Sequence, residues 1–325
     1  MRAVITGAAG FIGSRFTELF LEAAERLGYD DVVLLDALTY SGRRENMETA
    51  LLDERVRFVR GSIVDAEVTD GVLAGATAVV HFAAESHVDR SISNARTFFE
   101  TNVLGTQQLL ESARRAGVER FVHVSTDEVY GSIADGSWRE DHVLEPNSPY
   151  SSSKAGSDLA ALSYHRTYAL PVMVTRCSNN YGPRQFPEKV IPLFVTNLEE
   201  GLLVPLYGDG MNVRDWLHVD DHCRGVQLVL ENGRAGEVYN IGGGTELTNK
   251  ELTWRLLELC HKDSSMIESV ADRLGHDRRY SVDWTKIRDE LGYEPQVEFG
   301  EGLAATVQWY RDNEAWWRPL KGRAL

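Results

Sequence analysis

The stretch VITGAAGFIGSRF, residues 4–16, decides the fold of this chain. An apolar run rich in β-branched residues is followed by Gly7, Gly10 and Gly13, and then by an apolar pattern with helical spacing. Glycines let the backbone turn tightly and approach a pyrophosphate, and the helix N-terminus beyond them offers free N–H groups and a partial positive charge. The stretch therefore predicts a strand, a phosphate-binding turn and a helix, the first unit of a dinucleotide-binding domain. A glycine turn with a purely structural role is the alternative.

The next apolar run, residues 32–36, ends in Asp36, which lies 23 residues beyond Gly13. This is near the spacing at which an acidic residue meets the adenosine ribose in dinucleotide-binding domains. A carboxylate there accepts a hydrogen bond from a ribose 2′-hydroxyl and repels a 2′-phosphate. The sequence therefore predicts NAD rather than NADP as the cofactor.

The rest of the chain alternates between strand-like and helix-like segments. Short β-rich runs lie at residues 2–6, 32–36, 56–60, 78–82, 120–125 and 172–176, and helical patterns lie at 11–27, 95–116 and 150–168. Strands that are continuously apolar and alternate with helices are typical of an α/β fold, here a doubly wound parallel sheet of the Rossmann type.

The pattern loosens after about residue 178, where Gly and Pro become frequent. A late strand-like run lies at 237–243 and a helical run at 250–261. We expect a Rossmann domain over residues 1–178, to which the chain returns at about 215–243. Residues 179–214 and 244–325 are predicted to form a smaller mixed α/β lobe that binds the substrate.

Composition excludes several classes of protein. The 325 residues carry a formal net charge of −15, a poor electrostatic match for nucleic acid or an anionic membrane surface. No run approaches the ~20 apolar residues that a membrane-spanning helix needs. Cys177, Cys223 and Cys260 are too few and too scattered for a disulfide framework or a thiolate metal site. We expect a cytoplasmic protein that binds neither nucleic acid nor membrane and that gathers positive charge locally for any anionic ligand.

Two further motifs suggest proton chemistry on an alcohol. The run at 120–125 leads into Thr126, and the carboxyl ends of parallel strands face the ligand crevice. Tyr150 and Lys154 are four residues apart behind Pro149, which favours a helix start and places phenol and ammonium on one helix face. A nearby ammonium is expected to lower the pKa of the phenol so that it can take a proton from an alcohol. Taken alone, this spacing is also a common chance match.

The adjacent carboxylates of Asp127 and Glu128 indicate chemistry beyond alcohol oxidation. Elimination of water beside a ketone needs a base at carbon and an acid at the departing hydroxyl. Two carboxyl groups in different environments can divide these roles. The alternative is a solvated acidic turn.

His218 and His222 in HVDDH have the spacing of two metal ligands on a helix. A short spacing is weak evidence, and we favour a polar turn that leads into a helix. We therefore predict no metal site.

Several longer stretches carry a more specific resemblance, which covers nearly the whole chain. They are TGAAGFIGS, HFAAESHVDRSI, ETNVLGT, HVSTDEVYGS, PNSPYSSSKAGSD, TRCSNNYGPRQFPEKVIPL, LYGDGMNVRDWLHVDDH and YNIGGGTELTN. The chain resembles the extended short-chain dehydrogenase/reductase superfamily and, within it, the dTDP-D-glucose 4,6-dehydratase family. The STDEVYG segment is the most specific element, because 4-epimerases of the superfamily normally lack the Asp-Glu pair.

The resemblance implies a hydro-lyase (EC 4.2.1.46 type) that makes a nucleotide-linked 4-keto-6-deoxyglucose for deoxysugar biosynthesis with tightly bound NAD. Tyr150, assisted by Lys154 and Thr126, would remove the C4 hydroxyl proton during hydride transfer to NAD⁺. Glu128 would take the C5 proton and Asp127 would protonate the departing C6 hydroxyl, before the hydride returns to C6. The alternatives are another NAD-dependent nucleotide-sugar enzyme, such as a 4-epimerase or a decarboxylase, or a non-catalytic NAD-binding module.

The glycine motif and the resemblance together imply the ligand contacts. The cofactor would be met by Gly7, Gly10, Phe11, Ile12, Gly13, Asp36, Ala37, Leu38, Thr39, Ser62, Ile63, Phe82, Ala83, Ala84, Ser86, Thr101, Tyr150, Lys154 and Asn180. The substrate would be met by Ser86, Thr126, Asn179, Lys189, Val190, Pro205, Leu206, Tyr207, Arg214, Asn249, Asp272 and His276, with Arg279 or Tyr280 as further candidates. Lys189 and Arg214 are the natural partners of the sugar diphosphate.

The chain departs from the family pattern at two positions. Ser62 stands where an acidic residue is usual beside the adenine, and Leu274 stands where proline is frequent. The resemblance also implies a homodimer in which the helices near 95–116 and 150–168 form a four-helix contact. Packing of both helices against their own sheet is the alternative.

Overall fold

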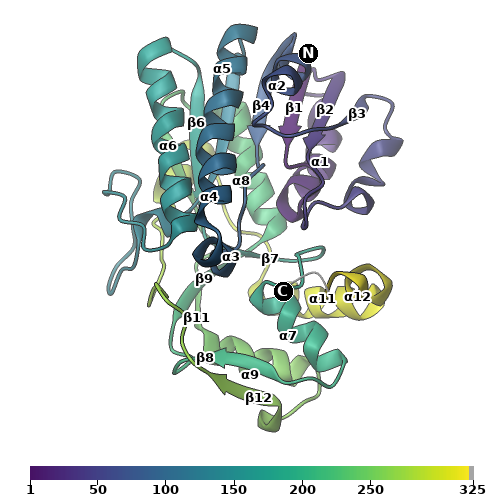
Figure 1. Ribbon diagram of the computed structural model, residues 1–325, viewed down its shortest axis with the longest axis vertical. Helices are drawn as coiled ribbons and strands as arrows, with labels where there is room; N and C mark the ends of the chain where they lie inside the picture. The colour runs from purple at the N-terminus through teal and green to yellow at the C-terminus, as the bar shows by residue number, and fades with distance from the viewer. Residues whose placement is uncertain (322–325) are drawn as a thin grey trace.

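The computed structural model describes residues 1–321, which are built around a seven-stranded parallel sheet (Figure 1). Its strands are β1 (Arg2–Thr6), β2 (Asp31–Asp36), β3 (Val56–Arg60), β4 (Ala76–His81), β5 (Arg120–Thr126), β6 (Val172–Cys177) and β10 (Val238–Ile241). They follow the order β10-β6-β5-β4-β1-β2-β3, and every neighbouring pair is parallel. The strand order reverses between β1 and β4, which places a ligand crevice at the carboxyl ends of these strands. The predicted doubly wound α/β fold is confirmed.

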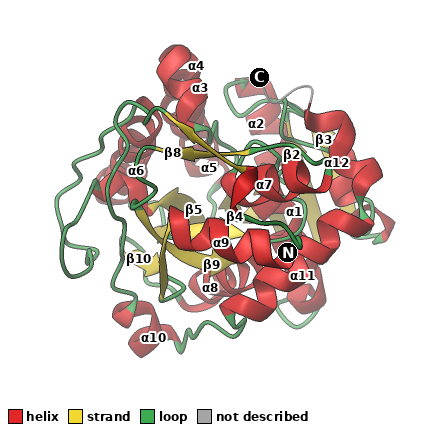
Figure 2. Cartoon of the chain, turned by 90° about the horizontal axis from the view of Figure 1, so that it is seen from below, coloured by secondary structure: helices red, strands yellow, loops and turns green. Residues whose placement is uncertain are grey.

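Helices cover both faces of this sheet. On one face lie α1 (Phe11–Ala24), α8 (Val219–Asn232) and α10 (Thr285–Leu291), and on the other lie α2 (Ala66–Leu73), α5 (Thr106–Ala116) and α6 (Pro149–Tyr168). Figure 2 shows α5 and α6 above the strands and α8 below them. Alternate strand residues supply the two cores: Ile5 packs in the core under α1 and α8, and Val4 packs in the core under α2, α5 and α6. Burial on both faces explains why the strands are continuously apolar.

The helix predicted over 95–116 is interrupted. It consists of α4 (Ala95–Phe98), a π-helical segment η3 (Phe99–Gly105) and α5. Within η3, Asn102 accepts a hydrogen bond from the Glu85 backbone N–H at 2.8 Å and donates to Glu85 O at 3.0 Å and Ser153 Oγ at 2.8 Å. These contacts bind the wide turn to the loop after β4 and to α6, and such π-turns are frequent at functional sites.

The smaller lobe hangs below the carboxyl edge of the sheet in Figure 1. It contains a three-stranded sheet, β7 (Asn179–Tyr181), β9 (Val213–His218) and β11 (Thr245–Thr248), and a two-stranded sheet, β8 (Val204–Tyr207) and β12 (Ile267–Val270). Its helices are α7 (Val190–Glu199), α9 (Asn249–Leu259), α11 (Phe299–Asp312) and α12 (Glu314–Lys321), which share a separate apolar core. Shorter turns of helix are α3 (Val88–Ser93), η1 (Arg44–Met47), η2 (Ala50–Leu52), η4 (Asp127–Tyr130) and η5 (Ser264–Met266).

The course of the chain between the two parts is more interleaved than the sequence indicated. β10 joins the large sheet beside β6, whereas β9, at the point where the return was expected, pairs with β7 and β11 in the lobe. Ile287 of α10, in a range assigned to the lobe, packs in the core beneath the large sheet. The boundaries 1–178, 179–214 and 244–325 therefore stay a prediction, and residues 322–325 lie outside the described part. Within residues 1–321, every helix is too short or too polar to cross a lipid bilayer.

The strand-to-helix unit at β1 and α1 has no room for a side chain at Gly7 or Gly13. Gly7 has a φ of +68°, and a Cβ on it would lie 2.6 Å from the backbone nitrogen of Ala83. A Cβ on Gly13 would lie 2.2 Å from the carbonyl oxygen of Gly7. These contacts with backbone atoms explain the glycine requirement, since backbone cannot move aside as a flexible side chain can.

We predict that Gly13→Ala lowers the free energy of unfolding by about 1–3 kcal/mol, the usual cost of overpacking, and reduces the NAD content of the purified protein. Gly71→Ala in α2 is the matched control, because a Cβ there meets nothing within 4 Å. It should leave NAD content unchanged and stabilise the protein slightly. Urea unfolding and released-nucleotide assays measure both effects, and equal NAD content in the two variants would contradict the prediction.

Candidate active site

A single cleft at the carboxyl ends of β1, β4, β5 and β6 brings together the glycine turn, the acid pair and the tyrosine–lysine pair. Of the residues predicted to bind the cofactor, all except Leu38 line this cleft. Leu38 instead adopts a left-handed conformation with a φ of +53° and donates its N–H to Asp36 Oδ1 at 2.7 Å. Its contribution is thus to hold the loop on which Ala37 and Thr39 face the cleft.

Asp36 lies at the end of β2 and organises the adenosine end of the cleft. Its Oδ2 accepts from the Ala9 N–H at 2.9 Å, and its Oδ1 accepts from Leu38. Burial raises the pKa of this carboxyl, while the two backbone N–H groups oppose the rise. Each carboxylate oxygen has more than one acceptor position, so the side chain can also accept from a ribose hydroxyl. The glycine turn and this acceptor fit a dinucleotide without a 2′-phosphate.

Helix α6, which carries Tyr150 and Lys154, begins at the position that its capping residues favour. Ser148 Oγ accepts from the Ser151 N–H at 3.1 Å, and Ser151 Oγ accepts from the Ser148 N–H at 3.0 Å, which forms a capping box ahead of Pro149. This start places Tyr150 and Lys154 on the face toward the cleft. Both are at least nine-tenths buried.

The Lys154 ammonium contacts the backbone of β5, and its expected effect on the phenol stays a prediction. Its Nζ donates to the Val124 carbonyl of β5 at 2.9 Å, and burial lowers its pKa to about 8 against the opposing charge of Asp158. The pKa of Tyr150 is raised, not lowered, because burial and the neighbouring Glu128 disfavour the phenolate. A hydrogen bond with Thr126 acts in the opposite direction.

The acid pair follows β5 in the short helix η4. Thr126 caps this helix by accepting from the Glu128 N–H at 3.3 Å, and its hydroxyl donates to Asp127 Oδ1 at 3.2 Å. Asp127 is 2% exposed, and burial together with Glu128 raises its pKa well above the usual range. The two carboxyl groups therefore cannot both hold a charge cheaply.

Nearby cations act differently on the pKa values of the two carboxyl groups. Burial raises the pKa of Glu128, but Arg273, Lys189 and Arg214 all lower it. For Asp127, Arg214 is the cation that opposes burial, and Glu128 and Asp215 raise its pKa further. The environment thus raises the pKa of Asp127 more strongly than that of Glu128, a difference of the kind that an acid and a base require.

The predicted substrate residues form two groups. Ser86, Thr126, Asn179 and Lys189 line the cleft, and Lys189 Nζ donates to Ser86 O at 2.6 Å. The others lie outside the cleft lining: Val190, Pro205, Leu206, Tyr207, Arg214, Asn249, Asp272 and His276.

Part of the second group is organised by contacts within the lobe. The Arg214 guanidinium lies 4.3 Å from the Tyr280 ring and donates to Asp277 O at 3.0 Å. His276 Nδ1 lies 2.6 Å from Asp272 Oδ1. Because Arg214 acts electrostatically on both acids of η4, this group of lobe residues adjoins the cleft.

The remaining sequence features fall outside the reactive centre. Arg279 forms an ion pair with Glu246 at 2.7 Å, and Leu274 is exposed. Ser62 lines the cleft at the position of the missing acid. His218 Nδ1 accepts from the Asp220 N–H at the start of α8, as expected for a turn that leads into a helix. In the described part of the chain, no group of three or more His, Cys, Asp or Glu side chains is arranged for a metal ion.

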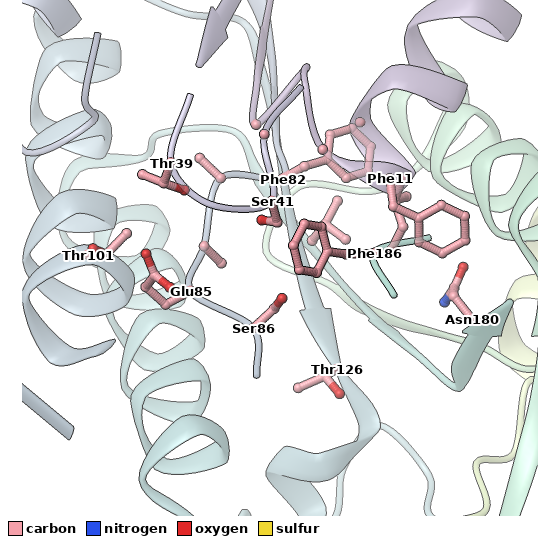
Figure 3. Close-up of a pocket in the computed structure, with 18 of the residues that line it drawn as sticks. Phe11, Thr39, Ser41, Phe82, Glu85, Ser86, Thr101, Thr126, Asn180 and Phe186 are labelled. Carbon is pink, nitrogen blue, oxygen red and sulfur yellow. The ribbon is translucent and has the colours of Figure 1, made fainter. Parts of the chain in front are cut away.

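Sequence reasoning missed one wall of the cleft. Lining residues that were not predicted include Ser41, Gly42, Cys177, Ser178, Arg184, Gln185, Phe186 and Glu188. Four of them belong to residues 182–189, which we call the strap. In Figure 3 the ring of Phe186 lies in the middle of the view, between Ser41 and Asn180. These four residues belong to the motif NNYGPRQFPEK, which ends in Lys189, a predicted substrate residue. Their nearness to Lys189 in the sequence was the signal by which they could have been predicted.

The strap is fastened to several elements around the cleft. Arg184, whose φ is +67°, donates to Glu18 Oε1 of α1 at 2.6 Å and to Asn46 O at 3.2 Å. Glu188 pairs with Arg90 of α3 at 2.9 Å. A left-handed non-glycine residue is costly and persists where its surroundings hold it. The strap therefore ties the lobe side of the cleft to the glycine-turn side.

The chain is similar in sequence and structure to several known proteins. A family model described as GDP-mannose 4,6 dehydratase matches residues 4–306. A dTDP-glucose 4,6-dehydratase of Streptomyces antibioticus is 62% identical, over 99% of this chain and 96% of its own. A dTDP-glucose 4,6-dehydratase of Streptomyces venezuelae, solved with NAD bound, has a TM-score of 0.97 and 62% identity, with 98% of this chain and 100% of that chain covered. A UDP-glucose 4-epimerase of Thermotoga maritima also matches, with a TM-score of 0.88 and 33% identity over 97% of this chain and 100% of its own.

We predict that Glu18→Gln speeds NAD dissociation about two- to five-fold, because it weakens the Arg184 anchor by roughly 0.5–1 kcal/mol from outside the cleft. Glu22→Gln, an exposed position on the same helix, changes the net charge equally and is the control. Dissociation is followed by the change in protein fluorescence after dilution into a nucleotide-free buffer. Equal rates for the two variants would show that the Arg184 anchor does not retain the cofactor.

Proposed function

The chain belongs to the GDP-mannose 4,6 dehydratase family, and we propose that it converts dTDP-D-glucose to dTDP-4-keto-6-deoxy-D-glucose and water. It is an NAD-dependent hydro-lyase of the extended short-chain dehydrogenase/reductase superfamily. The observation that carries this function is the pair of the buried Asp127 and the half-buried Glu128, which line the same cleft as Tyr150. Its place within a deoxysugar pathway is part of the proposal.

The protein's own groups divide the proton transfers. Tyr150 takes the proton of the C4 hydroxyl, and Thr126 lines the same cleft. The 4-ketone then acidifies the C5 proton, which Glu128 takes as the base. Asp127, kept protonated by burial, gives its proton to the C6 hydroxyl so that water leaves.

NAD, when bound, takes a hydride from the sugar and later returns it, and its oxidised ring carries a positive charge that favours the phenolate. The cofactor is thus regenerated in every turnover and must not be lost between the two transfers. The glycine turn, Asp36 and the strap are the residues that would hold it.

The main alternative is a 4-epimerase, because an epimerase shares this fold at 33% identity. An epimerase oxidises and reduces the same carbon, so it needs no base for C5 and no acid for C6. Asp127 is buried and Glu128 is half-buried beside the predicted hydride-transfer site, where unneeded carboxyl groups would be costly. This favours the dehydratase, and the intact Tyr150 and Lys154 favour an enzyme over a non-catalytic module.

The direct test is a panel of dTDP-, UDP- and GDP-glucose and GDP-mannose with the purified holoenzyme. The 4-keto-6-deoxy product is detected by its absorbance in alkali and by its mass, which is one water lower than that of the substrate. The proposal predicts the highest kcat/KM with dTDP-glucose. Formation of a 4-epimer without loss of water would overturn it.

We predict that Glu128→Gln still oxidises C4 but loses exchange of the C5 proton with solvent by about 10²-fold or more, since a positioned base contributes at least that much. Deuterium at C5 after incubation in D₂O measures the exchange, and NADH absorbance measures oxidation. Tyr150→Phe provides the contrast, because it should form neither NADH nor product. Exchange at the normal rate in Glu128→Gln would assign the base elsewhere.

The finer assignments of assembly and location belong to the proposal. A homodimer through α5 and α6 is supported by exposed apolar side chains on this side of the fold, Phe99, Leu104 and Leu159, of which the last two are 59% and 57% exposed. A cytoplasmic location is supported by three unpaired thiols, Cys177, Cys223 and Cys260.

We predict that Leu159→Lys shifts the protein from dimer to monomer in sedimentation velocity, because a charge replaces apolar contact at the centre of the helix pair. Leu52→Lys is the control, since Leu52 is 84% exposed on η2, away from these helices. A Leu159→Lys protein that sediments like the control would place the dimer contact elsewhere or exclude it.

A further inference from the structure

A buried asparagine outside the cleft joins the glycine turn to the smaller lobe. Asn46 lies on η1, is 2% exposed and stands outside the cleft lining. Its side-chain Nδ2 donates to the Ala9 carbonyl oxygen at 2.9 Å, and its Oδ1 accepts from the indole N–H of Trp316 on α12 at 3.0 Å. One side chain thus bridges the turn after β1 and a helix residue that lies 270 positions further along the chain.

The partners of Asn46 explain why this position holds an amide. A carbonyl oxygen only accepts hydrogen bonds, and an indole N–H only donates one, so the side chain between them must offer one donor and one acceptor. The asparagine backbone is engaged as well. Its N–H donates to Arg43 O at 3.1 Å, and its carbonyl accepts from Arg184 of the strap at 3.2 Å. The glycine turn, the strap and α12 therefore meet at one residue.

The contact with Ala9 fixes a peptide group of the glycine turn. Ala9 is fully buried, and its N–H donates to Asp36 Oδ2 at 2.9 Å. Its carbonyl oxygen accepts from the Arg43 N–H at 2.9 Å as well as from Asn46. Because a peptide group is planar, this also fixes the direction of the Gly10 N–H at the N-cap of α1, ahead of the N–H groups expected to meet the pyrophosphate. Asn46 therefore acts on the cofactor site through the backbone of the turn.

The lobe holds the other end of this connection. Trp316 packs edge to face against Trp309 of α11, with ring centroids 5.1 Å apart, and both rings pack against the apolar core of the lobe. Tyr310 of α11 donates its hydroxyl to Gln185 O, so the same pair of helices also holds the strap. In Figure 1, α11 and α12 lie below the part of the large sheet that carries β2 and β3. The two helices thus support the cofactor site from outside, by way of Asn46 and the strap.

We propose that Asn46 is a positioning residue through which α12 holds the glycine turn in its phosphate-binding conformation and slows the dissociation of NAD. The cofactor must stay bound between the two hydride transfers, and this connection makes the lobe contribute to its retention. The consequence for turnover rests on the proposed function. The consequence for NAD binding does not, because it is measured without a sugar nucleotide.

The experiment cuts the connection at either end. Trp316→Phe removes the indole N–H and keeps an aromatic ring, whereas Asn46→Asp keeps the acceptor for Trp316 and replaces the donor to the turn by an oxygen. Trp317→Phe is the matched control, because this adjacent indole is 1% exposed and donates to Tyr310 O inside the lobe at 2.7 Å. Each protein is loaded with radiolabelled NAD and mixed with excess unlabelled NAD, and the label that it retains gives the dissociation rate.

We expect NAD to dissociate about two- to five-fold faster from Trp316→Phe and about tenfold faster from Asn46→Asp, the range that one lost hydrogen bond produces. Trp317→Phe should release NAD at the wild-type rate, even if urea unfolding shows it to be the least stable variant. In the double variant, Trp316→Phe should add little to Asn46→Asp, because the connection to Ala9 is already cut. A role in lobe stability alone predicts instead that the two effects multiply.

Equal dissociation rates for Trp316→Phe and Trp317→Phe would overturn the proposal, and so would multiplied effects in the double variant. If Asn46→Asp does not fold, Trp316→Phe and its control still decide. With dTDP-glucose, Trp316→Phe should lose activity as turnover proceeds, and added NAD should restore it. Absence of any dehydrated product from wild type would instead refute the proposed function and leave the result on NAD dissociation unaffected.

Discussion

The burial of the Asp127 carboxyl group next to the half-buried Glu128 at the end of β5 is the constraint on which the rest of the site depends. Two unit charges at this spacing repel strongly where water is excluded, so one group stays protonated. The cations that surround them are unequal. Lys189, Arg214 and Arg273 all favour the ionised form of Glu128, whereas Arg214 is the cation that opposes burial at Asp127. All three cations lie beyond β6 in the chain, so later parts of the chain contribute to the difference in pKa on which the proposed roles of the two acids rest.

The large sheet in turn brings the parts into reach of one another. The strand order reverses between β1 and β4, and the glycine turn, the acid pair and the Tyr150 helix meet around that crevice. The same arrangement resolves the conflict between a net charge of −15 and anionic ligands. Free N–H groups at the turn and a few placed cations supply local positive potential, while acids such as Asp36, Asp127 and Glu128 serve as acceptors or reactants.

The sequence was most informative where chemistry depends on local spacing. The glycine turn, the ends of the strands and the start of α6 follow from residues within a few positions, and the structure brings them together. The strap and Arg273 could not be found this way, because they act on residues far away in the chain. The strap pairs with α1 and α3, and Arg273 acts electrostatically on Glu128. The raised pKa of Tyr150 was also missed, since helix spacing predicts that Lys154 shares its face but not that the ammonium binds the Val124 carbonyl. The π-helical turn at η3 depends likewise on contacts of Asn102 with the loop after β4 and with α6.

The central claim is that Asp127 is the protonated member of the pair at neutral pH and Glu128 the ionised one. Infrared difference spectroscopy of the holoenzyme, wild type against Asp127→Asn and Glu128→Gln, measures this directly through the C=O stretch of a protonated carboxyl. The account predicts that this band disappears in Asp127→Asn and persists in Glu128→Gln. Loss of the band in Glu128→Gln with its retention in Asp127→Asn would reverse the two roles and contradict the account.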